Sequence, residues 1–168
     1  MSEYFTYTPT IKYQGLLLTN PQKAVEIMDK EFRAAMEKSL MELQREVVLA
    51  TPINVGTLRA SITSEISGRA LDLEGRVGSP LQYAEPVEYG QDPHWPNIDA
   101  IAKSAHFKYG GLASYREEIQ RAFLIARSIA RKGVRAFRMF GKAFEKLSPK
   151  VRGYFDDAGE RAAKKLRE

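Results

Sequence analysis

The chain contains no cysteine, only one tryptophan and only two histidines among its 168 residues. The lack of cysteine excludes disulfides, thiolate metal sites and cysteine nucleophiles, and it favours a reducing compartment of origin. No apolar run approaches the roughly 20 residues that a membrane-spanning helix needs, and the first residues lack the apolar core of a signal peptide. These absences predict a protein that is made in the cytoplasm and is not inserted in a membrane.

The patterns of known catalytic sites are also missing. His94 and His106 stand outside any zinc-binding spacing. There is no Gly-x-Ser-x-Gly elbow and no phosphate-binding glycine loop. The acidic pairs at 117–118 and 156–157 fall in charged helical segments, where a solvated helix face is the favoured interpretation. We therefore expect a protein that is not an enzyme and that holds no cofactor or metal.

Charge, in contrast, is abundant and unevenly distributed. Residues 1–102 carry 9 Lys+Arg against 14 Asp+Glu, whereas residues 103–168 carry 17 against 7. Solvated helix faces would explain this split. Acidic and basic surfaces that meet, between neighbouring copies or against another partner, would explain it equally well. A third interpretation is nucleic-acid binding by the basic half.

A long amphipathic helix is predicted after Asn20, which is a typical N-cap, with Pro21 at the first helical position. Apolar residues recur every three or four positions from Val25 to Val47. The helix should end at Thr51, because the residue before a proline is disfavoured in the α region. Apolar and polar residues then alternate, which predicts a β-hairpin over 57–78.

The second half of the chain is predicted to be mainly helical. After a loop at 91–96 we expect a short helix over about 97–107. Ser114 and Glu117 have the spacing of a capping box and should open a helix that ends at Gly133. Residues 134–140 alternate loosely, as a third strand would, and Ser148-Pro149 has the pattern of a last helix start.

The predicted fold class is α+β, with a long N-terminal helix packed on a small antiparallel β-sheet and additional C-terminal helices. The predicted parts are an extended N-terminal arm at 1–20, an α+β domain at 21–147 with a helical insertion at 91–132, and a basic C-terminal helix at 148–168. The arm alternates Tyr, Phe and Thr. It could add a strand to a neighbour's sheet, or it could fray as many termini do.

Two segments stand out. Residues 50–62 read ATPINVGTLRASI and residues 78–90 read GSPLQYAEPVEYG. Together, in this order, they resemble the tail-completion or head–tail joining proteins of tailed bacteriophages, which pair a long N-terminal helix with similar elements. Asn54 and Thr57 depart from the usual residues of the first element. A basic stretch at 135–140 resembles the family's third mark without its prolines, and the insertion at 91–132 is longer than in compact members.

The resemblance assigns individual residues of this chain to the family's motif positions. These residues are expected to lie at interfaces or turns. They are Thr51, Pro52, Gly56, Leu58, Arg59, Ser61, Ile62, Gly78, Tyr83, Ala84, Val87, Glu88, Tyr89, Gly90, Arg135, Phe137 and Arg138. Of these, Arg59, Glu88, Arg135 and Arg138 are the candidates for ion pairs at an interface or a turn.

The resemblance implies a structural virion protein that forms a homo-oligomeric ring, expected to be a hexamer, at the neck where the head connector joins the tail. Its implied partners are further copies of itself, connector or head-closure proteins, and tail tube or terminator proteins, with DNA near by in the lumen. The motifs do not separate tail terminator, tail-completion and head-closure roles, or a ring of six from one of twelve. The alternative function is a DNA-binding module that uses the basic C-terminal half.

Overall fold

The computed structural model describes residues 20–53, 56–109 and 114–167 of the chain. The described residues form two compact units. Unit 1 consists of 20–47, 63–78 and 141–167, and unit 2 consists of 48–53, 56–62, 79–109 and 114–140. The predicted N-terminal arm lies almost wholly outside the described residues.

The long helix α2 (Pro21–Ala50) confirms the prediction from the apolar stripe. The Asn20 side chain caps it, because its Oδ1 accepts a hydrogen bond from Lys23 N at 3.1 Å. In unit 1 the buried face of α2 includes Met28, Phe32 and Leu40. The helix ends just before Thr51-Pro52, where the sequence placed its stop.

A two-stranded antiparallel sheet follows, and it is shorter than predicted. Strand β1 (Thr63–Ser67) pairs with β2 (Glu74–Gly78), and Thr63 lies opposite Gly78. The expected strand start is instead the short helix α3 (Thr57–Ala60). Backbone bonds from Ala60 N to Gly56 O and from Ser61 N to Thr57 O hold that turn. Four residues are too few for alternation to distinguish a strand from a helical turn.

The hairpin is fixed to α2 by close backbone approach and by hydrogen bonds. A side chain at Gly75 would come within 2.4 Å of the Met36 sulfur, so glycine lets β2 lie directly on the helix. At the turn, Asp29 Oδ1 accepts a bond from Ala70 N at 2.7 Å. This backbone donor and the Arg33 guanidinium hold the pKa of Asp29 below its usual value. In unit 1, α2 therefore packs on the sheet as the sequence predicted.

Helix α7 (Met139–Arg167) differs from the prediction, which started the last helix at Ser148. Pro149 lies inside α7 and removes one backbone hydrogen bond from it. Buried residues stand on both sides of the proline, Ala143 before it and Val151 after it. Burial of a continuous apolar face offsets the missing bond, and the cap-plus-proline pattern is therefore misleading here.

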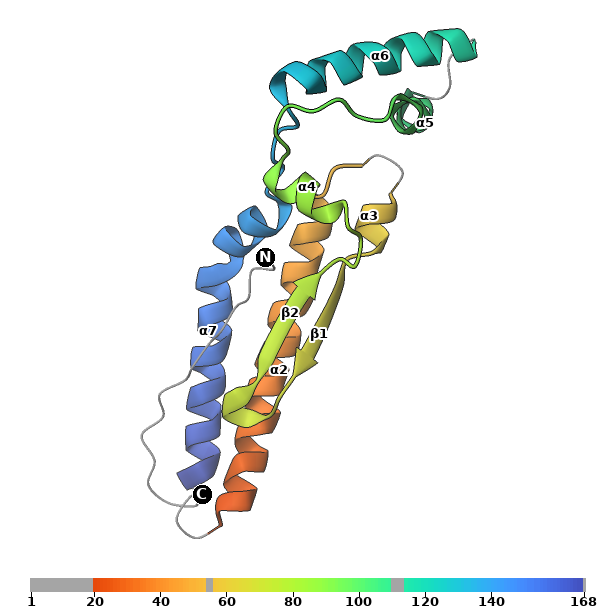
Figure 1. The fold of residues 1–168 in the computed structure, drawn as a ribbon. Helices are drawn as coiled ribbons and strands as arrows, with labels where there is room; N and C mark the ends of the chain where they lie inside the picture. Colours follow the sequence, from red (N-terminus) through yellow and green to blue (C-terminus); the bar gives the residue numbers. More distant parts are fainter. Residues whose placement is uncertain (1–19, 54–55, 110–113, 168) are drawn as a thin grey trace. The chain divides into compact units, whose positions relative to one another are not determined.

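Within unit 1, α2 and α7 lie side by side around one core (Figure 1). Phe32 stacks on Phe155 at a centroid distance of 6.4 Å. The other buried members of this core are mainly Ala, Met, Val and Leu: Ala24, Met28, Ala35, Met36, Leu40, Ala70, Val151, Ala158, Ala162 and Leu166.

Ion pairs at the edge of this core join acidic residues of α2 to basic residues of α7. Glu31 accepts bonds from Arg161 Nε at 2.9 Å and from Lys165 Nζ at 2.6 Å. Glu42 accepts bonds from Lys150 and Tyr154. These donors lower the pKa values of both carboxyl groups. Part of the charge split in the sequence is thus used inside one chain rather than between chains.

Unit 2 contains α3 and three further helices, α4 (Ala84–Tyr89), α5 (Ile98–Tyr109) and α6 (Tyr115–Lys132). Ser114 Oγ accepts a bond from Glu117 N at 3.4 Å, and Gly133 ends α6 with φ +70°, as the sequence predicted. The expected strand at 134–140 is wrong. Its only ladder contact in the described residues is one bridge, Gln91 to Val134. The residues that the structure describes hold no neighbouring strand with which the rest of the segment could pair, and α7 starts at Met139.

The fold class is α+β, as the sequence predicted: long helices, a small antiparallel sheet and C-terminal helices. Within the described residues, none of the helices combines the length and the apolar character that crossing a bilayer would require.

Candidate functional site

The segments that the sequence singled out meet in unit 2. We call residues 48–62, 79–90 and 134–140 the motif junction. Ser61 Oγ and Ser79 Oγ lie 2.7 Å apart, and this hydrogen bond joins the first segment to the second. Ser61 Oγ also donates to Leu58 O, and Leu81 N donates to Ser79 Oγ. The two serines therefore fix the turns on either side of the hairpin.

Arg59 holds the end of α2. Its Nε donates to Thr51 O at 2.8 Å, and its Nη2 contacts Leu49 O at 3.4 Å. The last carbonyl groups of a helix have no partner within the helix and carry partial negative charge. A guanidinium in this position satisfies them and complements the helix dipole. The structure thus places Arg59 on backbone carbonyl groups.

Glu88 caps the start of α7. Its Oε2 accepts a bond from Phe140 N at 2.9 Å, in the first turn of that helix. The Glu88 side chain is buried, and a carboxylate at a helix N-terminus satisfies a free N–H group and suits the positive end of the dipole. The two charged motif residues therefore cap opposite ends of two different helices.

The third segment is attached to α4 through its backbone. Phe137 N donates to Val87 O at 2.9 Å, and Arg138 N donates to Glu88 O at 3.0 Å. Gly90 has φ +81°, and a side chain there would come within 2.5 Å of Val134 O. Glycine is required at this position both for its conformation and for the close approach of the two segments.

The remaining motif residues divide into a buried and an exposed group. Thr51 is fully buried, and its hydroxyl contacts the sulfur of Met139 at 3.2 Å. The buried group also includes Leu58, Ile62 and Ala84, whereas Pro52, Gly56 and Val87 are half-buried. The exposed group consists of Tyr83, Tyr89, Phe137, Arg135 and Arg138. Gly78 is the last residue of β2 and belongs to unit 1.

Part of the chain matches a known protein family. Residues 17–90 match the family described as "Bacteriophage HK97-gp10, putative tail-component". This segment is HK97-gp10-like. The match confirms the predicted resemblance to a phage tail-protein family, and it covers α2, the hairpin and both singled-out segments. Searches of curated proteins and of solved structures gave no match.

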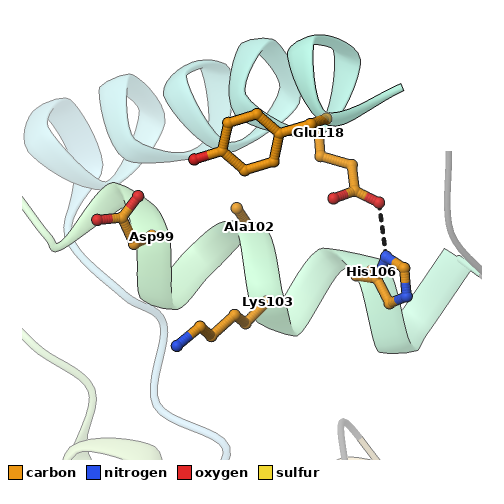
Figure 2. A pocket seen from close by; sticks show the side chains of 6 residues that line it. Asp99, Ala102, Lys103, His106 and Glu118 are labelled. Carbon is orange, nitrogen blue, oxygen red and sulfur yellow. Dashed lines mark hydrogen bonds and ion pairs between the residues drawn. The ribbon is translucent and has the colours of Figure 1, made fainter. Parts of the chain in front are cut away.

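The HK97-gp10-like segment ends at Gly90, so α5 and α6 lie outside the matched residues. Between these two helices is a pocket of about 440 Å³. Figure 2 shows its lining, in which His106 of α5 points to Glu118 of α6. The His106 Nδ1 to Glu118 Oε1 distance is 2.6 Å. The other lining residues are Asp99, Ala102, Lys103 and Tyr115.

This lining combines acidic, basic and hydroxyl groups on an open surface. Among the described residues, no three His, Asp or Glu side chains converge as a metal site would require. The contact between His106 and Glu118 joins α5 to α6 within this pocket.

Sequence reasoning missed several residues of the motif junction. Ser79 stood inside the second segment but gave no sign that it would reach Ser61. Met139 and Phe140 lie in the segment that was predicted as a strand, and nothing in the sequence connects them to Thr51 and Glu88. The start of α7 is what brings them there.

Proposed function

We propose that this chain is a structural subunit of a tailed-phage virion that closes into a ring at the neck and joins the head connector to the tail. The HK97-gp10-like match supports the coarser part, a phage tail component that contacts other phage proteins in the virion. The ring, the neck position and the absence of catalysis are parts of the proposal.

The proposal rests on a difference between the polar and the aromatic motif residues. The polar ones, Arg59, Ser61 and Glu88, are used on helix ends and turns within the chain. The aromatic ones remain partly exposed: Tyr83 is 46% exposed, Tyr89 51% and Phe137 44%. A scaffold that is fixed internally and offers large aromatic side chains has the composition of an interface core.

A closed ring requires a heterologous interface, in which one patch of a subunit contacts a different patch of the next. We assign the exposed aromatic side chains of the motif junction to one of the two patches. The sequence of the N-terminal arm, residues 1–20, suits the other side of such a contact, since it is rich in Tyr, Phe and Leu. The arm lies outside the described residues except for Asn20, so its part rests on sequence alone.

The test measures assembly directly. Purified protein is examined by mass photometry and electron microscopy, alone and with purified connectors or tails. We expect rings, and we expect Tyr83→Ser together with Phe137→Ser to reduce them while circular dichroism stays unchanged. The matched control is Met41→Ser on α2, which removes a side chain that is 72% exposed in unit 1.

A strictly monomeric protein at high concentration, with no ring on connectors or tails, would refute the joining role. Equal loss of rings in Met41→Ser would refute the assignment of the patch. Deletion of residues 1–19 should weaken assembly and leave the helix content intact.

A further inference from the structure

Helix α6 carries a group of exposed cations that the structure does not neutralise. Four arginines and one lysine on this helix are exposed: Arg116, Arg121, Arg127, Arg131 and Lys132. Within the part of the chain that the structure describes, none of these five side chains forms an ion pair. The contrast with α7 is direct, because Lys146, Lys150, Arg161 and Lys165 of that helix all pair with α2.

The five cations lie on one side of α6. At about 100° per residue, Arg116, Arg127 and Arg131 fall in one row along the helix. Arg121 and Lys132 form a second row, and the exposed side chain of Leu124 lies between the two rows. The buried residues Ala122 and Ala126 are on the opposite side, which faces α5 in unit 2 (Figure 1).

Aromatic side chains lie beside the first row. Phe123 projects next to the row of Arg116 and Arg127 and is 46% exposed. Trp95 packs edge-on against Phe123 at a centroid distance of 5.6 Å and is 55% exposed. Arginines and lysines clustered along one helix are the electrostatic footprint of nucleic-acid binding. Exposed aromatic rings beside such cations are also a feature of surfaces that bind single strands. The sequence alone did not separate these cations from the paired ones of α7.

A second copy of the chain carries no excess of negative charge. The described residues of unit 1 carry 15 Lys+Arg against 13 Asp+Glu, and those of unit 2 carry 10 against 6. Both units are net positive. A polyanion from outside the chain therefore complements five exposed cations better than a second copy does.

We propose that the exposed face of α6 binds the phosphate backbone of DNA. Four of the five cations are arginines, and the arginine fork matches phosphate oxygens in geometry. The contact is independent of sequence, because the rows present charge and ring faces rather than a set of base-reading groups. This site is additional to the ring function proposed above and does not depend on it.

The test uses fluorescence anisotropy with a labelled 20-base-pair duplex and the full chain. The variant is Arg116→Gln, Arg127→Gln and Arg131→Gln together. The matched control is Lys142→Gln, Arg152→Gln and Lys164→Gln, which removes the same charge from exposed positions of α7. We expect at least a tenfold loss of affinity in the α6 variant at low salt and a much smaller loss in the control.

The salt dependence gives a second readout. Each phosphate contact contributes about 0.9 to the slope of log Kobs against log salt concentration, so the α6 variant should reduce the slope by roughly 3. Trp95 is the only tryptophan. Its emission should change when DNA binds, because it lies beside the first row.

Three outcomes would overturn the proposal. One is an equal loss in both triple variants, which would make net charge alone responsible. Another is that the wild-type chain does not bind the duplex at all. The third is displacement of the duplex by polyglutamate at equal charge concentration, which would assign the face to an acidic protein.

Discussion

Unit 1 and unit 2 bury different kinds of side chain. The core of unit 1 contains Phe32, Phe155, Met28 and Met36, together with several leucines, valines and alanines. Unit 2 buries Leu58, Ile62 and Met139 together with several alanines, but no aromatic ring among its described residues is fully buried, and Trp95 and Phe123 are half-exposed. Of the twelve large apolar side chains that are exposed in the described residues, ten belong to unit 2. The large apolar side chains that remain exposed are thus concentrated in unit 2.

The two units also treat their charges differently. In unit 1 the carboxylates of α2 and the cations of α7 neutralise one another across the helix pair. In unit 2 the buried Glu88 is used on a backbone N–H group, while the cations of α6 remain exposed. The basic residues of the second half are therefore partly paired with carboxylates in unit 1, whereas those on α6 stay exposed in unit 2.

The largest expected effect on stability comes from removing a ring from the core of unit 1, and it should exceed the effect of the same change in unit 2. Phe32→Ala should lower the free energy of unfolding by about 3–5 kcal/mol, because it removes a fully buried ring and leaves a cavity. Phe123→Ala should lower it by less than about 1 kcal/mol, since that ring is half-exposed. Urea denaturation followed by circular dichroism measures both. Similar losses for the two variants would contradict the comparison.

The next effect concerns glycine in the motif junction. Gly90→Ala should cost about 2 kcal/mol or more, because it strains a positive φ and forces a methyl group against Val134 O. Gly153→Ala in α7 has open space and should instead stabilise by about 0.5–1 kcal/mol. Thermal unfolding of both variants shows whether each substitution lowers or raises the stability. A neutral Gly90→Ala would show that the junction is not closely packed.

A smaller effect is expected at the start of α7. Glu88→Ala should cost about 0.5–2 kcal/mol, because Phe140 N loses its acceptor in a buried place. Glu85→Ala changes an exposed residue of the same helix and should have little effect. Chemical denaturation of both variants tests the difference. An equal and small loss would mean that the cap contributes nothing to unit 2.

The smallest effect is the pH dependence of the helix pair in unit 1. Hydrogen bonds from Lys165 and Arg161 lower the pKa of Glu31, so its contribution is present above the unfolded-state value near 4.5 and is lost as the pH falls through the lower folded-state value. The Glu31→Gln variant should therefore lose less of its unfolding free energy below about pH 5 than the wild-type chain does, by roughly 1 kcal/mol. Glu26→Gln, an exposed position of the same helix, is the control for urea denaturation over this pH range.

Local signals in the sequence predicted elements correctly where a single physical cause is sufficient. Asn20 and Ser114 cap their helices through the atoms that their side chains offer, and Pro52 stops α2 through a steric effect on its neighbour. The strand at 134–140 and the helix start at Ser148 were wrong. The first needs a partner strand that the described residues do not contain, and the second depends on a buried face that runs past Pro149.

For the candidate site, the sequence identified most of the residues but not what they contact. It singled out Arg59 and Glu88 as charged motif positions and offered ion pairs at an interface or a turn. The structure places each on backbone groups at a helix end. A one-dimensional pattern cannot show this, because the carbonyl and N–H groups that they satisfy are identical at every residue and become available only where a helix ends.

By itself the sequence determined the fold class, the extent of α2, the family resemblance and the excess of basic residues in the second half. These follow from periodicity, capping chemistry and composition, which act over a few residues at a time. Only the tertiary structure decided which cations are neutralised and which are exposed. Pairing depends on which helix faces pack together, so α7 meets the carboxylates of α2 whereas the cations of α6 point away from the face that packs in unit 2.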